Sequence, residues 1–591
     1  MSSSPRPYGT LAVVAAATLG VTLAACSGGG PAQRAADLAR ADRAAVATGG
    51  TLHWALDAAP TTFNTFQTDA TDDTTLLAEA VLPTLFTLDE HAVARPDPDY
   101  LTGVEQTSQQ PQTVVYHLNP KAVWSDGKPL STADFAAQWH ALDGHDQAFW
   151  TARTAGYDRI ASVTQGATPQ DVKVVFAKPY GAWKGLFAPL YPAAATSSPT
   201  AFNDASRTAL AADAGPFTLK SSTAGTVTVV RNPHWWGDPV KLDAIAFTAV
   251  APAARTAALR DGKLDVADLS RAVEDGGAPA EAAARDVPGV GLHRASAPAY
   301  LQLTLNGGIG PLADPDLRRA VAQAVDRAQI ARAVLTPLGL PAVALGSHLV
   351  MADQDGYEDD SSALAAGTDN ATRHLDAAGW RLGGTLTAAK GDAAAPSAGN
   401  TVGGASGAPG PAAVPARSKD GHPLGLTLLT RTGSALDAQV AGLLTAQLGK
   451  VGIPVRIHAV SGDSFFADHV TSGDFDLALF SWPASSFPVA DEAALFTKPQ
   501  IGPDGTAVNG QNLSGTGTDE VDHLLAQATA ALDPQTAARL VSEADTRIWQ
   551  EAPSLPLFQR PELVAVRSDV ANAGAFGFTA PRFQDLGFTH S

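Results

Sequence analysis

Alternating and helical patterns of apolar residues follow one another along most of the chain. Runs in which apolar and polar residues alternate are typical of β-strands, because successive side chains of a strand point to opposite faces. The first such run covers residues 51–56, and we expect the fold to begin there. Further strands are predicted at 113–118, 172–176, 226–231, 301–305, 424–430, 455–459 and 476–481.

Apolar residues at helical spacing predict helices between these strands. Asp314 and Pro315 are suited to start a helix that continues to residue 335, with Asp326 and Arg327 as an ion pair inside it. Strands mixed with helices in this way predict an α/β fold rather than a sandwich or a helix bundle. A capping box at 131–134 opens another helix, and further helices are predicted at 434–451, 519–532 and 534–550.

Two stretches lack both patterns. Residues 27–50 are rich in Gly and Ala and are predicted to form a tether ahead of the fold. Residues from about 383 to 418 are predicted to form a disordered surface loop inside a folded domain. Between 388 and 416 nearly every residue is Ala, Gly, Ser, Pro, Thr or Asn, which bury too little apolar area to offset the entropy lost on ordering.

The N-terminus has the pattern of a secretory signal. A polar start precedes an apolar run over 11–23, which is too short to span a bilayer of about 30 Å comfortably. Residues 23–26, Leu-Ala-Ala-Cys, resemble the lipobox of bacterial lipoproteins. The resemblance implies that residues 1–25 are removed and that Cys26 carries the lipid, which would hold the protein at the outer face of the cell membrane. The alternative is an ordinary signal peptide with a chance cysteine.

Composition and missing motifs exclude several classes of function. The chain has 40 Lys and Arg against 59 Asp and Glu, a net charge of −19, which argues against nucleic-acid binding. Its single cysteine excludes an intrachain disulfide and a multi-cysteine metal centre. No HExxH, phosphate-binding P-loop or Gly-x-Ser-x-Gly motif is present. We therefore expect neither enzyme activity nor a cofactor, and we interpret the histidines at 140 and 145 as solvated surface.

Six motifs, spread from residue 123 to residue 482, carry a family resemblance. Each is weak alone, but their order and spacing between 51 and 567 resemble the family 5 extracellular solute-binding proteins of bacterial ABC importers, which bind oligopeptides, dipeptides or nickel. The motifs are Trp-Ser-Asp-Gly at 124–127, Gly-Pro-Phe at 215–217 with Arg-Asn-Pro at 231–233, Leu-Arg-Asp-Gly-Lys-Leu-Asp at 259–265, the helix start at 314–318 with Ala-Val-Asp-Arg at 324–327, Ala-Ala-Gly-Trp at 377–380, and Leu-Gly-Lys-Val-Gly-Ile-Pro-Val at 448–455 followed by Ser-Trp at 481–482.

The resemblance implies two hinged α/β lobes, as in periplasmic binding proteins, with an extra N-terminal subdomain. A ligand bound between the lobes would stabilise the closed state, which the ABC transporter permease subunits then recognise. We expect the protein to work as a monomer. Carried over to this sequence, lobe I covers 51–78, 203–297 and 556–591, the extra subdomain covers 79–202, lobe II covers 298–555, and the crossings between lobes lie near 297–304 and 553–560.

One departure from the family pattern concerns the ligand. Peptide-binding members place an Asp three residues after the Trp of Ser481-Trp482, where it pairs with the peptide's α-amino group, but this chain has Ser485. A neutral hydroxyl cannot replace a buried carboxylate opposite an ammonium, so a free peptide N-terminus is in doubt. Aromatic faces beside hydroxyl and amide groups suit peptides, sugars or amphiphiles. The candidate ligand-binding residues are Phe63, Asn64, Phe66, Tyr300, Gln302, Trp482, Ser485, Ser486 and Phe487, with the alternative that Trp482 and Phe487 are core.

Two functions stay open at this point. The first is a lipid-anchored receptor of an ABC importer for peptides or peptide-like compounds. The second is an envelope lipoprotein of the same fold that acts in the assembly of phosphatidylinositol mannosides and lipoarabinomannan, a role known for one branch of the family. In that case the ligand would be a glycolipid.

Overall fold

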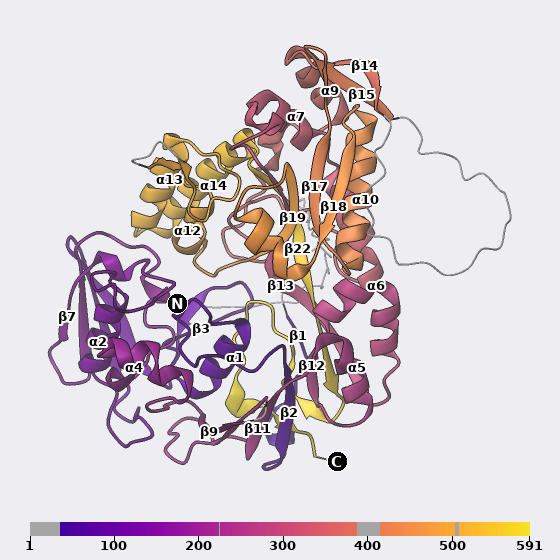
Figure 1. The fold of residues 1–591 in the computed structure, drawn as a ribbon. Helices are drawn as coiled ribbons and strands as arrows, with labels where there is room; N and C mark the ends of the chain where they lie inside the picture. Colours follow the sequence, from indigo (N-terminus) through magenta and orange to yellow (C-terminus); the bar gives the residue numbers. More distant parts are fainter. Residues whose placement is uncertain (1–35, 224, 387–413, 503–506, 591) are drawn as a thin grey trace, which may run out of the picture.

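A ten-stranded mixed sheet runs through the molecule and joins its upper and lower halves in Figure 1. The computed structural model describes residues 36–223, 225–386, 414–502 and 507–590. Strands and helices are mixed in this part of the chain, so the predicted α/β class is confirmed. Across the sheet the order is β18 (Val455–Val460), β17 (Leu426–Arg431), β19 (Leu477–Pro483), β13 (Val290–Leu305), β22 (Ser554–Arg567), β12 (Val266–Asp268), β2 (Thr51–Leu56), β11 (Ala244–Ala249), β10 (Thr226–Arg231) and β9 (Phe217–Thr223).

Two long strands, β13 and β22, connect the halves of this sheet. They pair antiparallel from Val290 opposite Arg567 to Thr304 opposite Ser554. The C-terminal part of β22 pairs with β12 in the lower half. The C-terminal part of β13 pairs with β19 in the upper half. Their register shifts between Ser296 and Tyr300, a local irregularity of the kind that lets a sheet bend. The predicted crossings at 297–304 and 553–560 fall on this strand pair, whereas the exact lobe boundaries stay predictions.

The lower half combines its part of the large sheet with a separate antiparallel sheet of four strands. Buried side chains of both sheets belong to one hydrophobic core, which includes Trp54 and Phe247 of the large sheet and Tyr116 of the small one. The four-stranded part therefore packs directly on the large sheet. Its elements are β5 (Leu101–Gln109), β6 (Gln112–Leu118), β8 (Asp171–Phe176), β7 (Ile160–Gln165) and α2 (Thr132–Leu142), and the helices of the lower half include α1 (Asp72–Val81), α5 (Pro252–Arg260) and α6 (Ser270–Arg285).

The Trp-Ser-Asp-Gly motif and the following capping box form one structural unit. Asp134 accepts hydrogen bonds from the Ser131 backbone N–H (2.9 Å) and from Nε1 of the buried Trp124 (3.2 Å). Its other carboxylate oxygen accepts from the Ala193 backbone N–H at 2.8 Å. The predicted capping box at the start of α2 is confirmed. The motif thus serves the fold rather than a ligand.

The upper half packs helices around β17, β18, β19 and the adjoining ends of β13 and β22, with a hydrophobic core of its own. The predicted helices at 434–451, 519–532 and 534–550 are present with ends shifted by at most two residues. Ser434 caps its helix as an N-cap that accepts from the Asp437 N–H. The helices are α7 (Pro315–Gln323), α8 (Arg327–Leu335), α9 (Thr368–Ala377), α10 (Ala435–Lys450), α13 (Asp519–Ala530) and α14 (Pro534–Glu551).

The single helix predicted over 315–335 is wrong, because it is broken into α7 and α8. Asp326 has a non-helical backbone and caps α8 by accepting from the Gln329 N–H at 2.8 Å. The predicted ion pair of Asp326 with Arg327 is therefore not formed. Instead the Arg327 guanidinium lies 4.4 Å from the centre of the Trp549 ring and donates to the Pro556 carbonyl at 3.1 Å.

The fold begins earlier than predicted. Residues 37–38 form β1 (Asp37–Leu38), which pairs with β24 (Gly574–Ala575) near the C-terminus. Val46 is buried, and Lys241 donates to its carbonyl at 2.9 Å. The prediction of a free tether up to residue 50 is thus wrong from residue 37 onward, because this segment finds backbone partners in the C-terminal strands. The predicted signal peptide and Cys26 lie outside the described residues.

The predicted low-complexity loop is shorter than 383–418. Both of its ends belong to a small antiparallel sheet, in which β14 (Arg381–Leu386) pairs with β15 (Val414–Lys419). Arg417 is only 1% exposed and donates to the Val451 carbonyl at 2.7 Å. Residues 387–413, on which the rest of the prediction falls, lie outside the described part of the chain. The remaining short elements include β3 (Phe86–Leu88), β4 (Ala94–Pro96), β16 (His422–Pro423), β20 (Gln500–Ile501), β21 (Ala507–Val508), β23 (Val570–Ala571), β25 (Gly587–Phe588), α3 (Ala193–Thr196), α4 (Pro199–Asn203), α11 (Gly462–Ser464) and α12 (Pro488–Asp491).

Candidate functional site

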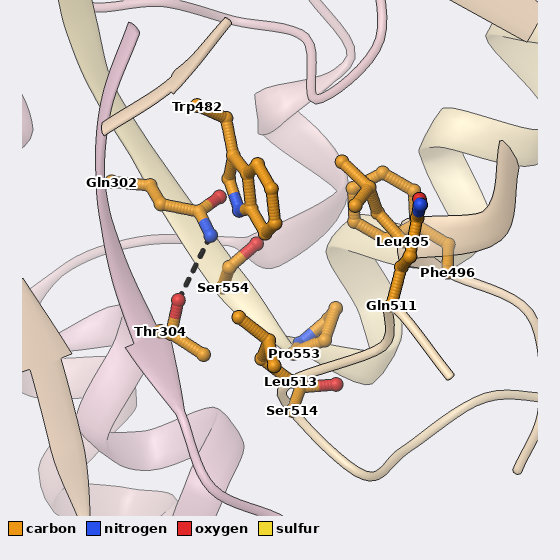
Figure 2. A pocket seen from close by; sticks show the side chains of 10 residues that line it. All are labelled: Gln302, Thr304, Trp482, Leu495, Phe496, Gln511, Leu513, Ser514, Pro553 and Ser554. Carbon is orange, nitrogen blue, oxygen red and sulfur yellow. Dashed lines mark hydrogen bonds between the residues drawn. The ribbon is translucent and has the colours of Figure 1, made fainter. Parts of the chain in front are cut away.

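A small cavity lies against the upper ends of the crossing strands (Figure 2). It encloses about 260 Å³ of empty space, part of it open to solvent. Because part of this space belongs to open solvent, the enclosed cavity is well below the roughly 300–1,000 Å³ of typical ligand pockets, and this conformation has little room for a ligand as large as a peptide. The lining residues are Gln302, Thr304, Trp482, Leu495, Phe496, Gln511, Leu513, Ser514, Pro553 and Ser554.

The cavity combines an aromatic wall with uncharged polar groups. The Trp482 ring stands beside Gln302 and Ser554 in Figure 2, and none of the ten lining residues is Asp, Glu, Lys, Arg or His. Gln302 donates from Nε2 to Thr304 Oγ1 at 2.8 Å. Its Oε1 and the Ser554 hydroxyl are buried and have no hydrogen-bond partner among the described residues. Each such buried group costs about 1–3 kcal/mol, which favours a molecule that supplies donors here.

The structure brings Tyr300, Gln302 and Trp482 together, as the sequence predicted. Tyr300 and Trp482 are opposite each other in the pairing of β13 with β19. Tyr300 is fully buried against Leu345 and Met351, and its burial raises the pKa of the phenol well above its usual range. It therefore lies behind the cavity wall, while Gln302 and Trp482 line the cavity itself. Whether they touch a ligand stays a prediction.

Ser485 is held by hydrogen bonds of its own loop. Its backbone N–H donates to Glu492 Oε1 at 3.0 Å, and its hydroxyl donates to Asp491. Its carbonyl accepts from Gln354 Nε2 at 2.8 Å, and its hydroxyl accepts from the Phe487 N–H at 2.9 Å. The neighbouring Ser486 is partly buried in the same loop. Ser485, Ser486 and Phe487 are not among the residues that line the cavity.

Two carboxyl groups next to Ser485 are not available as free anions. Asp491 forms an ion pair with Arg153 of the small-sheet part, with 2.7 Å between nitrogen and oxygen. Glu492 is 4% exposed, and its burial raises the pKa well above the usual range, with the charge of Asp491 adding to the rise. Burial therefore favours the neutral form of the Glu492 carboxyl. Neither carboxyl group therefore takes the place of the Asp that peptide-binding members of the family have at the position of Ser485.

The loop around Ser485 also closes the molecule against the small-sheet part. Phe487 packs on Gly185, where an added Cβ would come within 2.7 Å of the ring. The Gly181 N–H donates to the Thr529 carbonyl at 2.8 Å, close to the end of α13. Together with the Arg153–Asp491 pair, these contacts hold the upper half on the small-sheet part beside the cavity.

The aromatic loop at 63–66 does not reach the cavity. Phe63 and Phe66 are buried in the core of the lower half, and the Phe66 ring packs edge-on against Tyr191. Asn64 is 2% exposed and donates to the Phe202 carbonyl at 3.2 Å. The sequence analysis placed these side chains on a ligand platform, whereas the structure uses them for packing. A ligand contact from this loop stays an untested prediction.

Most of the remaining lining residues were missed by the sequence analysis. Thr304 could have been found, because strand alternation places it on the same face of β13 as Gln302. Gln511, Leu513 and Ser514 come from an irregular loop without any periodic signal. Behind Ser554 lies another unpredicted feature, the pair of His348 and Asp545.

His348 and Asp545 are both completely buried. The His348 ring faces Asp545 Oδ1 from Nδ1 at 2.8 Å and the Ser554 carbonyl from Nε2 at 3.1 Å. Both ring nitrogens thus lie within hydrogen-bond distance of an oxygen atom. The pair holds the backbone of Ser554 at the cavity wall.

Neither a metal-binding cluster nor a membrane-spanning helix is found in the residues that the structure describes. No group of three or more possible metal-binding side chains occurs in this part of the chain. None of its helices has the length and apolar composition needed to cross a bilayer.

Comparison with known proteins identifies the family. The model of the bacterial extracellular solute-binding proteins, family 5 Middle, matches residues 95–502. The oligopeptide-binding protein OppA of Mycobacterium tuberculosis is 34% identical over 93% of this chain and 87% of its own length. The probable monoacyl phosphatidylinositol tetramannoside-binding protein LpqW of the same species is 25% identical over 81% of this chain and 80% of its own length.

Solved structures share the fold. The periplasmic EDTA-binding protein EppA superimposes with a TM-score of 0.79 over 94% of this chain and 98% of its own, at 24% identity. The oligopeptide-binding protein AppA of Bacillus subtilis, in complex with a nonapeptide, gives a TM-score of 0.67 over 92% of this chain and 100% of its own, at 17% identity. The two-lobed architecture predicted from the sequence is thereby confirmed, and the chain belongs to family 5 of the bacterial extracellular solute-binding proteins.

Proposed function

We propose that this protein is a lipid-anchored receptor on the extracytoplasmic face of the cell membrane, which captures a peptide-like solute for an ABC importer. The uncharged cavity with its tryptophan wall is the observation that carries the proposal. A peptide backbone supplies N–H donors for Gln302 Oε1 and Ser554 Oγ, which have no partner among the described residues. The 34% identity to an oligopeptide-binding protein supports the same class of ligand.

We further propose that the ligand lacks a free α-amino group near Ser485. An ammonium buried without a carboxylate loses its hydration without compensation, at a cost of several kcal/mol. Asp491 is already paired with Arg153, and burial raises the pKa of Glu492 and so disfavours its charged form. N-blocked peptides or peptide-like compounds should therefore bind better than ordinary peptides.

Ligand entry requires the molecule to open. The cavity is too small for a peptide, and the contacts of Asp491 and Phe487 hold the upper half on the small-sheet part. Opening at the crossing strands would break these contacts, and a bound ligand would restore closure only through its higher affinity for the closed state. Permease subunits would then recognise the closed form.

Thermal-shift and calorimetric titrations test the ligand class. N-acetylated tetrapeptide amides should bind, and at about 100 times their dissociation constant they should stabilise the fold by about 2.7 kcal/mol. The same peptides with a free N-terminus should bind at least tenfold more weakly. Tight binding of the free peptide that is lost on acetylation would refute this part of the proposal.

Variants locate the site. Trp482→Ala should weaken binding without unfolding the protein, because its side chain is only partly buried. Trp150→Ala is the matched control, since Trp150 is 60% exposed and does not line the cavity. If Trp482→Ala binds normally, the cavity is not the ligand site.

A second candidate function is the recognition of a glycolipid in envelope assembly. Hydroxyl-rich head groups also suit an uncharged cavity with an aromatic face, and the relative LpqW carries a name of this kind. Titration with mannosylated phosphatidylinositol head groups in the same assay separates the two candidates. Binding of these head groups together with failure of every blocked peptide would favour this second function.

A further inference from the structure

A second hollow lies in the upper half, among helices that do not border the first cavity. It has about 650 Å³ of empty space and is open to solvent. Helices α7, α9 and α14 surround it, together with residues 363–365 of a short connecting segment; α7 and α9 lie at the top of Figure 1. Its lining residues are Arg319, Gln323, Ala363, Leu364, Ala365, Asn370, Arg373, His374 and Gln550.

The charge of this hollow is opposite to that of the whole chain. Arg319, Arg373 and His374 line it, and no Asp or Glu is among the lining residues, although the chain has a net charge of −19. Within the described residues, none of these three basic side chains forms an ion pair. Two guanidinium groups that share a concavity without a carboxylate partner attract anions.

The donors of the two arginines are only partly used. Arg319 donates from Nε and Nη2 to the Gln550 carbonyl, at 3.0 and 2.7 Å. Arg373 donates from Nη2 to the Asn370 side chain. Nη1 of both arginines and Nε of Arg373 have no protein acceptor in the described part of the chain. A guanidinium with such donors to spare matches the oxygens of a phosphate group.

Two further polar atoms beside the hollow lack partners. Gln323 is 3% exposed and donates from Nε2 to the Leu364 carbonyl at 2.9 Å, but its Oε1 has no donor among the described residues. The same holds for Nδ1 of His374, which is buried and without a partner there. An unpartnered carbonyl oxygen next to cationic groups favours a ligand that carries a hydroxyl as well as an anionic group.

We propose that this hollow binds a phosphate ester of a polyol, with the phosphate on Arg319 and Arg373 and a hydroxyl toward Gln323. The same chemistry occurs in a soluble sugar or glycerol phosphate and in the head group of a phospholipid. The site is separate from the first cavity, so it does not depend on the proposed import function.

Calorimetry with sn-glycerol 3-phosphate and inorganic phosphate, and sedimentation with vesicles of phosphatidylcholine with or without phosphatidylinositol, test the proposal. The soluble chain without its first 25 residues and with Cys26→Ser avoids binding through a lipid. Binding to the soluble phosphates alone identifies a soluble ligand, and binding to the phosphatidylinositol vesicles alone identifies a head group; either result supports the site. The absence of binding in both arms overturns the proposal.

Arg373→Gln is the decisive variant, because Arg373 is exposed and donates its hydrogen bond to Asn370 of the same helix, whereas Arg319 also ties α7 to α14. Loss of one charge-assisted hydrogen bond should weaken binding about ten- to hundredfold. Arg332→Gln on α8 is the matched control, since it removes the same charge from an exposed position outside the hollow. Equal weakening by both variants would show a nonspecific charge effect and refute the site. Trp482→Ala should leave phosphate binding unchanged.

Discussion

The buried pair of His348 and Asp545 offers a sharp test of what stabilises the upper half. The change is Asp545→Asn, which keeps the shape of the side chain and removes its charge. Both side chains are completely buried, and the His348 backbone N–H also donates to Asp545 Oδ1 at 3.0 Å. In the variant, the buried His348 ring and the His348 backbone N–H face a neutral amide instead of a carboxylate.

The expected loss follows from burial. Neutralising one partner of a fully buried, hydrogen-bonded pair costs about 3–5 kcal/mol, because the other partner loses its interaction in a medium of low polarity without gaining water in return. The pair of His469 and Asp474 provides an exposed comparison, with a similar separation of 3.0 Å and a side chain of Asp474 that is 72% exposed. Solvent screens such a pair, so Asp474→Asn should cost about 1 kcal/mol or less.

Hydrogen exchange measured by mass spectrometry is the suitable assay, because a two-lobed protein need not unfold in one step. A loss of about 3 kcal/mol corresponds to more than hundredfold faster exchange in the slowest amides of α14 and of the segment that contains His348. Amides of the small four-stranded sheet should change little. If Asp545→Asn accelerates exchange no more than Asp474→Asn does, the pair is not the support inferred from its geometry.

Three further predictions concern other regions. Cys26→Ala should move the protein from the membrane fraction to the soluble fraction, and a wild type without lipid by mass spectrometry would contradict the proposed anchor. Burial raises the pKa of Glu562 to about 8, so the folded protein keeps a proton that the unfolded chain releases above about 4.5. The free energy of unfolding should therefore fall between pH 4.5 and 8, and urea titrations at pH 5 and pH 8 should show a smaller fall in Glu562→Gln; equal falls would rule out Glu562 as the source. Arg417→Met should lower the free energy of unfolding by roughly 2–4 kcal/mol, because the guanidinium donates hydrogen bonds to Asp376 (2.6 Å) and to two backbone carbonyls. A urea midpoint equal to that of wild type would contradict this prediction.

Local features of this fold could be predicted from the sequence. The capping box of Ser131 and Asp134 was found because its hydrogen bonds join residues three apart. The bounds of α10 and β10 follow from periodicity and from residues at their ends, such as the N-cap Ser434. Six short motifs in the right order were enough to find the family, because they form turns and helix starts that members of the family share.

The length of β13 and the break between α7 and α8 could not be predicted. Strand β13 begins eleven residues before the predicted strand at 301–305, because its partner β22 supplies hydrogen bonds where the sequence alternates poorly. The break at Asp326 sits beside Gln447 of α10, whose side chain accepts from the Asp326 N–H at 3.0 Å. Both outcomes depend on partners more than a hundred residues away.

The candidate site was decided mostly by tertiary structure. Of the residues predicted to contact the ligand, Gln302 and Trp482 line the cavity, whereas Phe63 and Phe66 pack in the core of the lower half, and the ligand contacts themselves stay predictions. The sequence pattern around an aromatic residue is the same whether the side chain packs in a core or lines a ligand cavity, because both environments bury apolar area. The buried pair that supports the cavity wall at Ser554 joins remote residues: His348 and Asp545 are 197 positions apart. Positions in the sequence do not predict this contact, because it depends on how β13, β22 and α14 pack around a shared core.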